Sequence, residues 1–461
     1  MPGSLTFEFK FTTPKAARPV DADQPMRLLI MGDFSGRADA TPGANVIGPV
    51  DIDNLDRIMA RMAPSCPDVP GFDGIDDFTP DALFRRLPLF QSLRQLRADL
   101  LNPATFATAA ASLRDADPAT PDGSAGASDF AQLLGGTVQR PQGASSGIDI
   151  GTVIKNIVGA IPSVDPMQGQ YVAAVDEEIG RAMRAILHAP AFRAVESAWR
   201  DVHFLITNLE LDHTLQVHLL DMGKDALGRQ LQAAQGNLEA TGLYQLLVQA
   251  GRAAPDSAAW SAIIGAYTFA PTEDDLATVA AMGALGAQAG APFIAATNDP
   301  GQWDDDDRAA WQALRTCPWA AWIGMGMPAY LQRLPYGKNT DRVDQFDFEE
   351  AAADPRDTPL LWGSAGVVCA RLLGQAFMDA GWEMEPGDAL EVDDLLAYSY
   401  KIDGVPHLQA CAQVGLSEAT ATALAQQGVM PLLSYKNRAA LRLLRSQSVA
   451  SPSQALRGPW A

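Results

Sequence analysis

Histidine and cysteine are scarce in this chain of 461 residues, and each scarcity argues against a class of site. Only five histidines occur, and the first 187 residues contain none, so a triad in the N-terminal part has no histidine base. The four cysteines, Cys66, Cys317, Cys369 and Cys411, form no C-x-x-C pair, which argues against a metal knuckle. Widely spaced thiols are typical of a reducing compartment, so we expect a cytoplasmic protein.

Long hydrophobic runs and an excess of positive charge are also missing. No apolar stretch of about 20 residues occurs, so we expect no membrane span. The N-terminal MPGSLTFEFKF lacks the basic and then apolar layout of a signal peptide. The formal net charge of −21 disfavours a nucleic-acid partner, because phosphate backbones are bound by basic surfaces. The composition, 47% hydrophobic and 19% charged, is that of a globular protein. The length of 461 residues gives room for about three domains.

Periodic patterns predict mixed helices and strands in residues 1–114. Residues 5–11, LTFEFKF, alternate apolar and polar, which predicts a strand with one buried face. MRLLIMGDFSG predicts a buried strand at 26–31 that enters a turn at 32–36. A short strand and a helix follow in VDIDNLDRIMARMAP, and the helix ends at Pro64.

A further helix is predicted to begin at Thr79, as N-cap, and Pro80, in the first helical position. Its apolar residues recur every three or four positions through residues 83–96. From 115 to 148 proline, glycine, serine and alanine dominate, which predicts a flexible linker. Residues 149–461 then alternate helical and strand patterns, and this alternation favours a mainly parallel sheet.

The segment LPYGKNT at 334–340 suggests a phosphate loop, but the spacing fails. A Walker A loop needs a glycine five residues before its Gly-Lys pair and Ser or Thr after the lysine. Gln332 and Asn339 occupy those positions, so the glycine-rich nest of N–H groups is missing. GMGMPAY is a still weaker dinucleotide motif, because Ala329 stands where the third glycine belongs.

Candidate metal and nucleophile residues are better explained as structural. His213 and His218 are five positions apart, which places them on opposite faces of a strand. The acidic run 304–307 lacks glycine-punctuated ligand spacing and fits a solvated loop. Asp33 is followed by no G-x-S-x-G elbow and fits a turn. The tryptophans, Trp199 among them, fit core and contact anchors, so we expect no catalytic residue, cofactor or metal.

Two stretches nevertheless resemble known proteins. MRLLIMGDFSG, VDIDNLDRIMARMAP and DDFTPDALFRRLPLFQSLRQLRADL, in this order, resemble the small contractile-sheath subunit of the bacterial type VI secretion system. From residue 150 onward the chain resembles the large sheath subunit, in ILHAPAFRAVESAWRDVHFLITNLE, RLPYGKNTDRVDQFDFEE, LLWGSAGVVCARLLGQAFMDAGW and GVMPLLSYKN. The resemblance implies an α/β fold, with a small α/β lobe packed on a larger mixed-sheet lobe. It therefore implies a small-subunit-like domain (1–114), a linker (115–148) and a large-subunit-like domain (149–461).

The resemblance also implies a mechanical role. Sheath subunits are not enzymes; they stack around an inner tube and donate strands to a neighbour's sheet, which relies on main-chain hydrogen bonds at a sheet edge. LTFEFKF is a candidate donor. Implied partners are other sheath subunits or a second copy, inner-tube or baseplate proteins, and a sheath-recycling ATPase, for which SDFAQLLGG is a candidate contact. The family-motif residues, expected to be structural, are Gly32, Asp33, Phe34, Ser35, Gly36, Trp199, Arg200, Leu334, Pro335, Tyr336, Gly337, Phe346, Phe348, Trp362, Gly363, Gly381 and Trp382.

One departure from the family pattern leaves several roles open. Large sheath subunits continue past SYKN into a further C-terminal domain, whereas this sequence ends at SQSVASPSQALRGPWA. We therefore expect either a regular subunit or a sheath-associated component that caps, nucleates or lies near the baseplate. A regulatory or binding protein that reuses the sheath scaffold is the alternative, and an enzyme with an unrecognised site is a remote one.

Overall fold

The computed structural model describes residues 7–9, 11, 23–37, 46–67, 69, 71–115, 168–249, 259–352 and 354–460. The predicted linker at 115–148 lies outside these ranges, except for Asp115. The predicted strand at 5–11 is wrong for Phe7, Glu8 and Phe9, which are described but form no strand. Phe7 is instead buried in an apolar core, and Phe9 and Phe11 pack against the same core.

A mixed sheet of nine described strands forms the centre of the fold, in the order β2-β3-β1-β4-β5-β6-β12-β13-β9. Neighbouring strands from β3 to β12 are parallel, and antiparallel strands flank them at both edges. The predicted α/β class is therefore confirmed. The strands are β1 (Met26–Gly32), β2 (Ile47–Val50), β3 (Leu215–Asp221), β4 (Ala262–Phe269), β5 (Phe293–Thr297), β6 (Ile323–Met327), β9 (Glu391–Val392), β12 (Val429–Ser434) and β13 (Leu441–Leu443).

Strand β1 joins residues 1–114, called the N-terminal segment below, to the rest of the chain. It lies between β3 and β4 and pairs in parallel with both, from Met26 opposite Leu215 on one side and from Leu28 opposite Ala262 on the other. Its run of apolar residues is typical of a strand buried on both faces. The first described strand is therefore an interior strand of the nine-stranded sheet.

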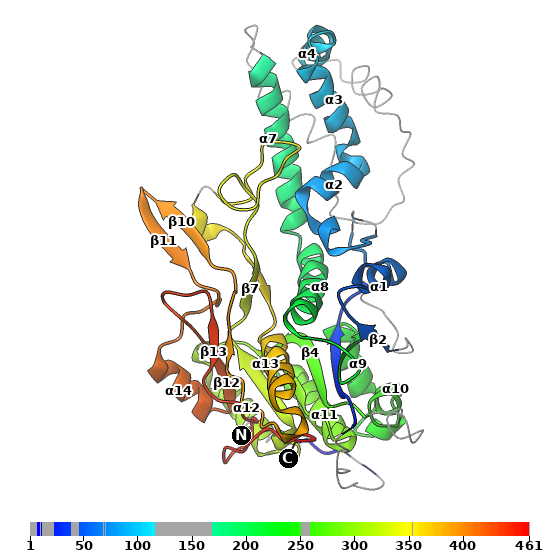
Figure 1. Cartoon of the computed structure of the whole chain (residues 1–461), viewed down its shortest axis with the longest axis vertical. Helices are drawn as coiled ribbons and strands as arrows, with labels where there is room; N and C mark the ends of the chain where they lie inside the picture. Colours follow the sequence, from blue (N-terminus) through cyan, green and yellow to red (C-terminus); the bar gives the residue numbers. More distant parts are fainter. Residues whose placement is uncertain are drawn as a thin grey trace.

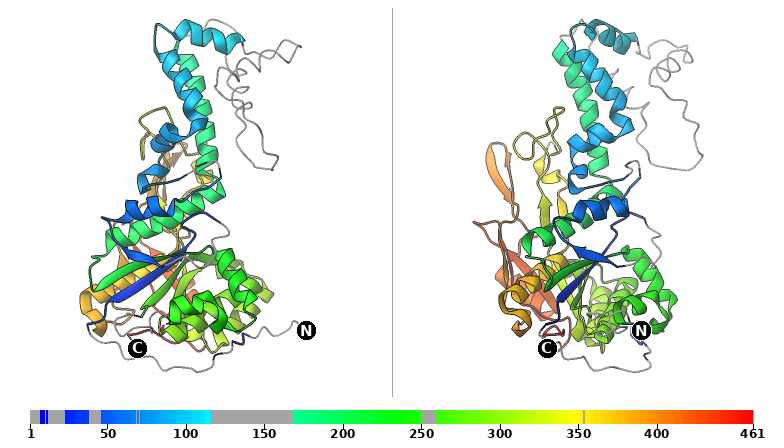
Figure 2. Two further views of the ribbon diagram at one scale, coloured as in Figure 1. Left: turned by 90° about the vertical axis from the view of Figure 1, so that its right-hand side faces the viewer. Right: turned by 45° about the vertical axis from the view of Figure 1, so that its right-hand side comes forward.

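Helices cover both faces of this sheet (Figures 1 and 2). Side chains alternate along β1, so that Met26, Leu28 and Ile30 enter one core while Leu29 and Met31 enter the other. The helices are α1 (Leu55–Met62), α2 (Pro80–Arg86), α3 (Gln91–Leu101), α4 (Phe106–Asp115), α7 (Gln168–Leu187), α8 (Pro190–Asn208), α9 (Lys224–Ala233), α10 (Gly242–Tyr244), α11 (Glu273–Ala289), α12 (Asp305–Thr316), α13 (Ala365–Ala380) and α14 (Glu418–Gln426).

The predicted helix that starts at Thr79 is confirmed at its start but is shorter than its apolar pattern. Thr79 caps α2 by accepting a hydrogen bond from Ala82 N (3.4 Å). The helix ends before Pro88, which has no N–H to donate to the carbonyl of Phe84. The guanidinium of Arg94 donates to that carbonyl instead. A short 3₁₀ turn, Pro88–Phe90, then leads into α3.

Helices α3 and α7 extend side by side away from the sheet (Figures 1 and 2). They are joined by a bidentate ion pair in which Arg97 Nε and Nη2 lie 2.5 and 3.1 Å from the carboxylate oxygens of Asp176. Two small antiparallel sheets complete the described part of the fold. They pair β7 (Tyr330–Arg333) with β8 (Leu361–Gly363), and β10 (Tyr398–Ile402) with β11 (Val405–Gln409).

Candidate structural junction

The turn after β1 binds directly to helix α8. Backbone N–H groups of Phe34 and Ser35 donate to one carboxylate oxygen of Asp221, at 2.9 and 3.0 Å. The indole N–H of Trp199 donates to the carbonyl of Phe34 (2.8 Å), and the two rings lie 5.4 Å apart between centroids. Trp199 and Phe34 are both fully buried. The GDFSG segment and Trp199, distant in sequence, therefore form one contact.

Gly32, Asp33 and Gly36 shape this turn. Burial, followed by the charge of Asp221, raises the pKa of Asp33, while backbone N–H groups of Gly36 and Arg37 oppose the rise. Gly36 has φ +68°, and a Cβ there would lie 2.0 Å from the carbonyl oxygen of Ser65. A Cβ on Gly32 would press on the Phe34 ring at 3.0 Å. These residues define a tightly packed turn.

Helix α8 carries a buried carboxylate that holds two arginines. Glu196 is fully buried, and its Oε1 accepts from Arg333 Nε (2.8 Å) and from Arg200 Nε (2.9 Å). Arg200 comes from the next turn of the same helix, whereas Arg333 comes from β7. Arg200 also reaches the hydroxyl of Tyr336 at 3.4 Å. The motif residues Arg200 and Tyr336 are thus brought together around Glu196.

Arg333 also binds a second buried carboxylate, that of Glu350. Its two terminal nitrogens donate to Glu350 at 2.7 and 2.9 Å, and Tyr336 N donates to the same group at 2.9 Å. His188 Nε2 lies 3.3 Å from Glu350. Burial raises the pKa of Glu350, but His188, Arg333 and the Tyr336 N–H outweigh it and hold the pKa at about 2. One arginine therefore bridges two carboxylates, an arrangement that suits its forked geometry.

A second buried carboxylate of α8, Asp201, has neutral partners only. Its Oδ1 accepts from Tyr330 Oη and Gln332 Nε2, both at 2.8 Å, and its Oδ2 accepts from Ser364 N at 3.2 Å. Burial raises the pKa of Asp201 to about 7, against the effect of these donors. Gly363 leaves no room for a side chain, since a Cβ would come within 2.6 Å of Asp201 and 2.4 Å of Tyr330. The β7–β8 hairpin thus rests closely on α8.

The remaining residues of LPYGKNT form a closed loop. The ammonium of Lys338 pairs with Asp347 at 3.0 Å, and its backbone N–H donates to Glu349 at 3.0 Å. A Cβ on Gly337 would lie 2.1 Å from that same Glu349 carboxylate. The carbonyls of Leu334 and Pro335 accept from Arg333 (3.2 Å) and Thr340 (2.5 Å). The lysine and the glycine make structural contacts, so the arrangement gives no support to a phosphate loop.

The end of the loop meets helix α2 of the N-terminal segment. Backbone N–H groups of Asp344 and Gln345 donate to Asp81 at 3.1 Å each. The ring of Phe346 lies 4.7 Å from that of Phe84, and Phe346 and Phe348 are 5.6 Å apart. The contact combines hydrogen bonds with ring packing, which adds specificity to apolar burial.

The other motif residues lie along the same boundary or at its far end. The carbonyl of Trp362 accepts from Ser197 Oγ of α8 at 3.1 Å. Trp382 instead follows α13, where its ring lies 5.0 Å from Phe377 and its indole N–H donates to the carbonyl of Gln24 at 2.7 Å. Gly381, with φ +60°, provides the turn before it. Trp382 therefore holds the chain just before β1. It does not belong to the charged cluster of Glu196, Arg333 and Glu350.

Sequence reasoning missed the charged centre of this junction, namely Glu196, Asp201, Arg333, Glu350 and Asp221. A usable pattern was present. Glu196 and Arg200, like Ser197 and Asp201, are four residues apart on a helix otherwise rich in buried apolar residues. Acidic residues on an apolar helix face require partners, because an unpaired buried charge is costly.

The carboxylates Glu196 and Glu350 of the junction bind Arg333, whereas Asp201 binds neutral donors. Among the described residues, no group of three or more His, Cys, Asp or Glu side chains is placed to hold a metal ion. None of the helices in the described ranges is long and apolar enough to cross a membrane. What the geometry supports is a rigid connection between the N-terminal segment, α8 and the β7–β8 hairpin.

Comparison with known proteins gives two results. The family described as VipB (EvpB/VC_A0108), tail sheath N-terminal domain, matches residues 169–304 and 297–450. The type VI secretion system sheath protein TssC1 of Pseudomonas aeruginosa is similar to this chain, with 27% identity over 319 residues. The similar region covers 64% of this chain and 63% of that protein. The chain thus spans a little under two thirds of the length of this relative.

Proposed function

This chain belongs to the VipB tail-sheath N-terminal domain family, and on that premise we propose that it is a structural component of a type VI secretion sheath. The match extends over residues 169–450, which include α8, β7, β8 and the charged cluster. The matched family is one of sheath proteins, and the contacts of the junction hold elements of the chain together. We therefore assign the protein a mechanical function in the cytoplasm.

The finer part of the proposal concerns the N-terminal segment. We propose that residues 1–114 are the equivalent of a small sheath subunit and that the chain combines both subunits in one polypeptide. In support, β1 lies between two strands of the matched region, and Asp81 and Phe84 contact the loop that follows LPYGKNT. A covalent connection raises the effective concentration of one part for the other, to the millimolar range for short flexible linkers.

The expected partners are other sheath subunits, a second copy of the chain, inner-tube or baseplate proteins, and a sheath-recycling ATPase. Capping, nucleating and baseplate-proximal roles remain predictions beside that of a regular subunit. The observation that carries the proposal is the family match, supported by the closed charge pairs of the matched region.

A pull-down from cell extract tests the function, with the full-length tagged chain as bait. We expect sheath subunits of the secretion system to be retained, together with inner-tube or baseplate proteins. The matched control is the same bait with Arg333→Met, in which the junction is broken. Retention of regulatory proteins without any component of the secretion machine would instead favour the alternative of a reused scaffold.

Electron microscopy of the purified protein separates the structural roles. A capping or baseplate component is expected to form short or discrete particles. Long regular tubes formed by the chain alone would contradict such a specialised role and favour a regular subunit.

A further inference from the structure

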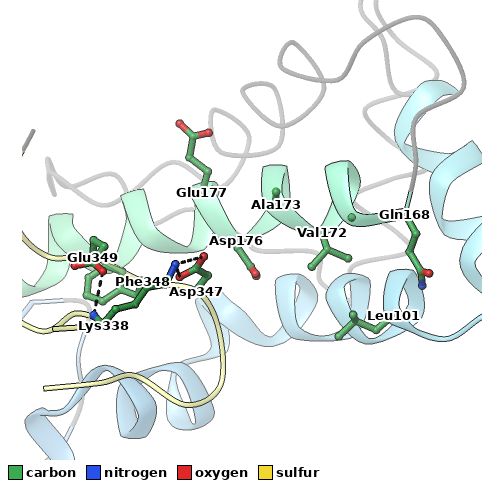
Figure 3. A pocket seen from close by; sticks show the side chains of 11 residues that line it. Leu101, Gln168, Val172, Ala173, Asp176, Glu177, Lys338, Asp347, Phe348 and Glu349 are labelled. Carbon is green, nitrogen blue, oxygen red and sulfur yellow. Dashed lines mark hydrogen bonds and ion pairs between the residues drawn. The ribbon is translucent and has the colours of Figure 1, made fainter. Parts of the chain in front are cut away.

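The groove between α3 and α7 (Figure 3) encloses about 580 Å³, but the charges of its lining are used within the chain. Asp176 binds Arg97 at 2.5 Å, and Asp347 binds Lys338 at 3.0 Å. The side chain of Glu177 points away from the groove. Charge therefore selects no ligand for this groove.

A different apolar surface is covered by residues near the N-terminus of the chain. Phe7 is buried in one of the two cores, and Phe9 and Phe11 pack against the same core. Glu8, between the first two rings, is exposed. Because side chains alternate along an extended backbone, the three rings lie on one side and the carboxylate on the other. Residues 7–9 and 11 are called the N-terminal strap below.

The surface beneath the strap comes from separate parts of the chain. The ring of Phe11 lies 6.4 Å from that of Tyr244 in α10, stacked on it, and 5.5 Å from that of Trp319, which it meets edge-on. The carbonyl oxygen of Glu8 lies against Gly236, where a Cβ would come within 3.1 Å of it. Gly236, Tyr244 and Trp319 together are called the strap surface. It is shaped for a close backbone and for aromatic rings.

The strap is held mainly by its side chains. Phe7, Glu8 and Phe9 form no strand, so no ladder of main-chain hydrogen bonds fixes them to a neighbouring strand. Strand β1, by contrast, is paired on both sides. Segments with few backbone hydrogen bonds and partly exposed side chains open at a lower free energy than a paired core. The strap is therefore expected to open before β1 does.

Opening the strap uncovers the aromatic surface that it shields. With the strap closed, Tyr244 is buried and Trp319 is partly buried. A segment of the same chain meets its surface at a high effective concentration, so a modest intrinsic affinity is enough to keep it closed. A free peptide of the same sequence must compete with this tethered segment.

We propose that the N-terminal strap is a lid that closes, within its own chain, over an aromatic binding surface formed by Gly236, Tyr244 and Trp319. The surface takes an extended peptide with aromatic side chains at alternate positions, because the segment that occupies it has this pattern. An external peptide enters only when the strap is open. This inference goes beyond the sheath function and does not depend on it.

Peptide binding to the full chain tests the surface and its lid together. The probe is a fluorescein-labelled peptide with the sequence of residues 5–11, LTFEFKF, read by fluorescence anisotropy. We expect it to bind the Phe11→Ser chain at least tenfold more tightly than the wild type, because the weakened strap opens. Glu8→Ser, which changes the outward side of the same strap, is the matched control and is expected to behave as the wild type does.

The same titration can contradict the proposal. Equal binding to the wild type and to the Phe11→Ser chain would overturn it, because the strap would then not close the surface. The absence of binding to both chains would overturn it as well. A peptide with serine in place of its three phenylalanines is expected to bind at least tenfold more weakly. Equal affinity of the two peptides would show that the rings are not recognised.

Hydrogen exchange of the full chain measures the closed strap directly. Phe11→Ser is expected to raise the exchange of amides in residues 242–249 about tenfold or more and to leave β1 unchanged. Unchanged exchange in β1 also shows that the variant is folded. A rise in β1 equal to that in residues 242–249 would overturn the proposal, because Phe11 would then belong to the common core.

Protein concentration separates closing within one chain from exchange between two copies. The protection of residues 242–249 in the wild type is expected to stay constant over a hundredfold dilution. Protection that falls on dilution would overturn the proposal by assigning the strap to a second copy. Failure of any of these tests leaves the sheath assignment standing, because the pull-down examines that assignment independently.

Discussion

Among single residues, Arg333 is expected to have a large effect on stability. Arg333→Met removes the charge that holds Glu196 and Glu350, both nearly inaccessible to solvent. Breaking a buried ion pair by removing one partner typically costs about 3–5 kcal/mol. We expect a loss of this order in the free energy of unfolding, measured by urea denaturation.

The same sequence motif supplies the control for Arg333. Lys338→Ala breaks the pair with Asp347, in which both side chains are more than half exposed. We expect a change of at most about 1 kcal/mol, because solvent screens exposed pairs. Equal losses in the two variants would contradict the distinction between a buried bridge and a surface pair. Arg333→Lys is expected to be nearly as damaging as Arg333→Met, because lysine cannot bind both carboxylates in the same geometry.

Asp201 makes the stability of the fold depend on pH. Its folded pKa of about 7 lies above the ordinary value of 3.8, so the folded state holds a proton that the unfolded state has released between these values. This contribution is greatest at the acidic end and is lost as pH rises through 7, by up to about 1.4 kcal/mol per pH unit. Glu350, with a pKa of about 2, acts in the opposite direction but titrates below this window.

Asp201→Asn tests this dependence, because the amide oxygen can still accept from Tyr330 and Gln332. We expect the unfolding free energy of the variant, relative to the wild type, to increase between pH 5 and pH 8. Asp305→Asn is a matched control, because that side chain is fully exposed on α12. A difference between Asp201→Asn and the wild type that stays constant over this range would contradict the raised pKa.

At the scale of elements, the turn after β1 depends on close approach. Gly36 and Gly71 both have positive φ, +68° and +66°, so alanine is strained at either position. Only at Gly36 would a Cβ meet backbone, the carbonyl of Ser65 at 2.0 Å, whereas nothing lies within 4 Å at Gly71. We expect Gly71→Ala to cost about 1 kcal/mol and Gly36→Ala clearly more, measured by thermal unfolding. Equal costs would show that backbone strain alone governs both positions.

Local patterns predicted many elements because their causes are local. The apolar run at Met26 and the Thr79–Pro80 start each have a physical reason within a few residues. The break at Pro88 was also readable from local rules, since proline cannot continue the hydrogen-bond ladder. The prediction of a strand at 5–11 was wrong for Phe7, Glu8 and Phe9, because alternation fits any extended segment with one buried side.

The junction could be predicted only in part. The resemblance identified Trp199, Tyr336 and Gly363, but no local rule pairs Glu196 with Arg333, which is 137 positions later in the sequence. Such contacts depend on tertiary topology, which brings α8 against the β7–β8 hairpin. The placement of β1 between β3 and β4 is likewise non-local, because both neighbouring strands come from a distant part of the sequence.

At the scale of the whole molecule, the N-terminal segment is held by several independent contacts. Strand β1 pairs on both sides, Arg97 binds Asp176, and the Trp382 indole N–H donates to the carbonyl of Gln24. The segment also contributes to the same apolar core as α7, α8 and α13. The N-terminal segment is therefore expected to bind the rest of the chain as strongly as the partners of an obligate complex bind each other, because such interfaces resemble a domain core cut in half.

A chain that is cut between the N-terminal segment and the rest of the protein is therefore expected to stay together. A protease site inserted near residue 140 and cleaved in the folded protein is expected to leave two fragments that elute together in size exclusion, because an interior strand cannot leave without breaking the sheet. Concentrated urea is the control and should separate the fragments. Co-elution would favour the interpretation of two fused subunits joined by a linker at 115–148. Separation under native conditions would contradict it, because the covalent connection would then be the main contact between the parts.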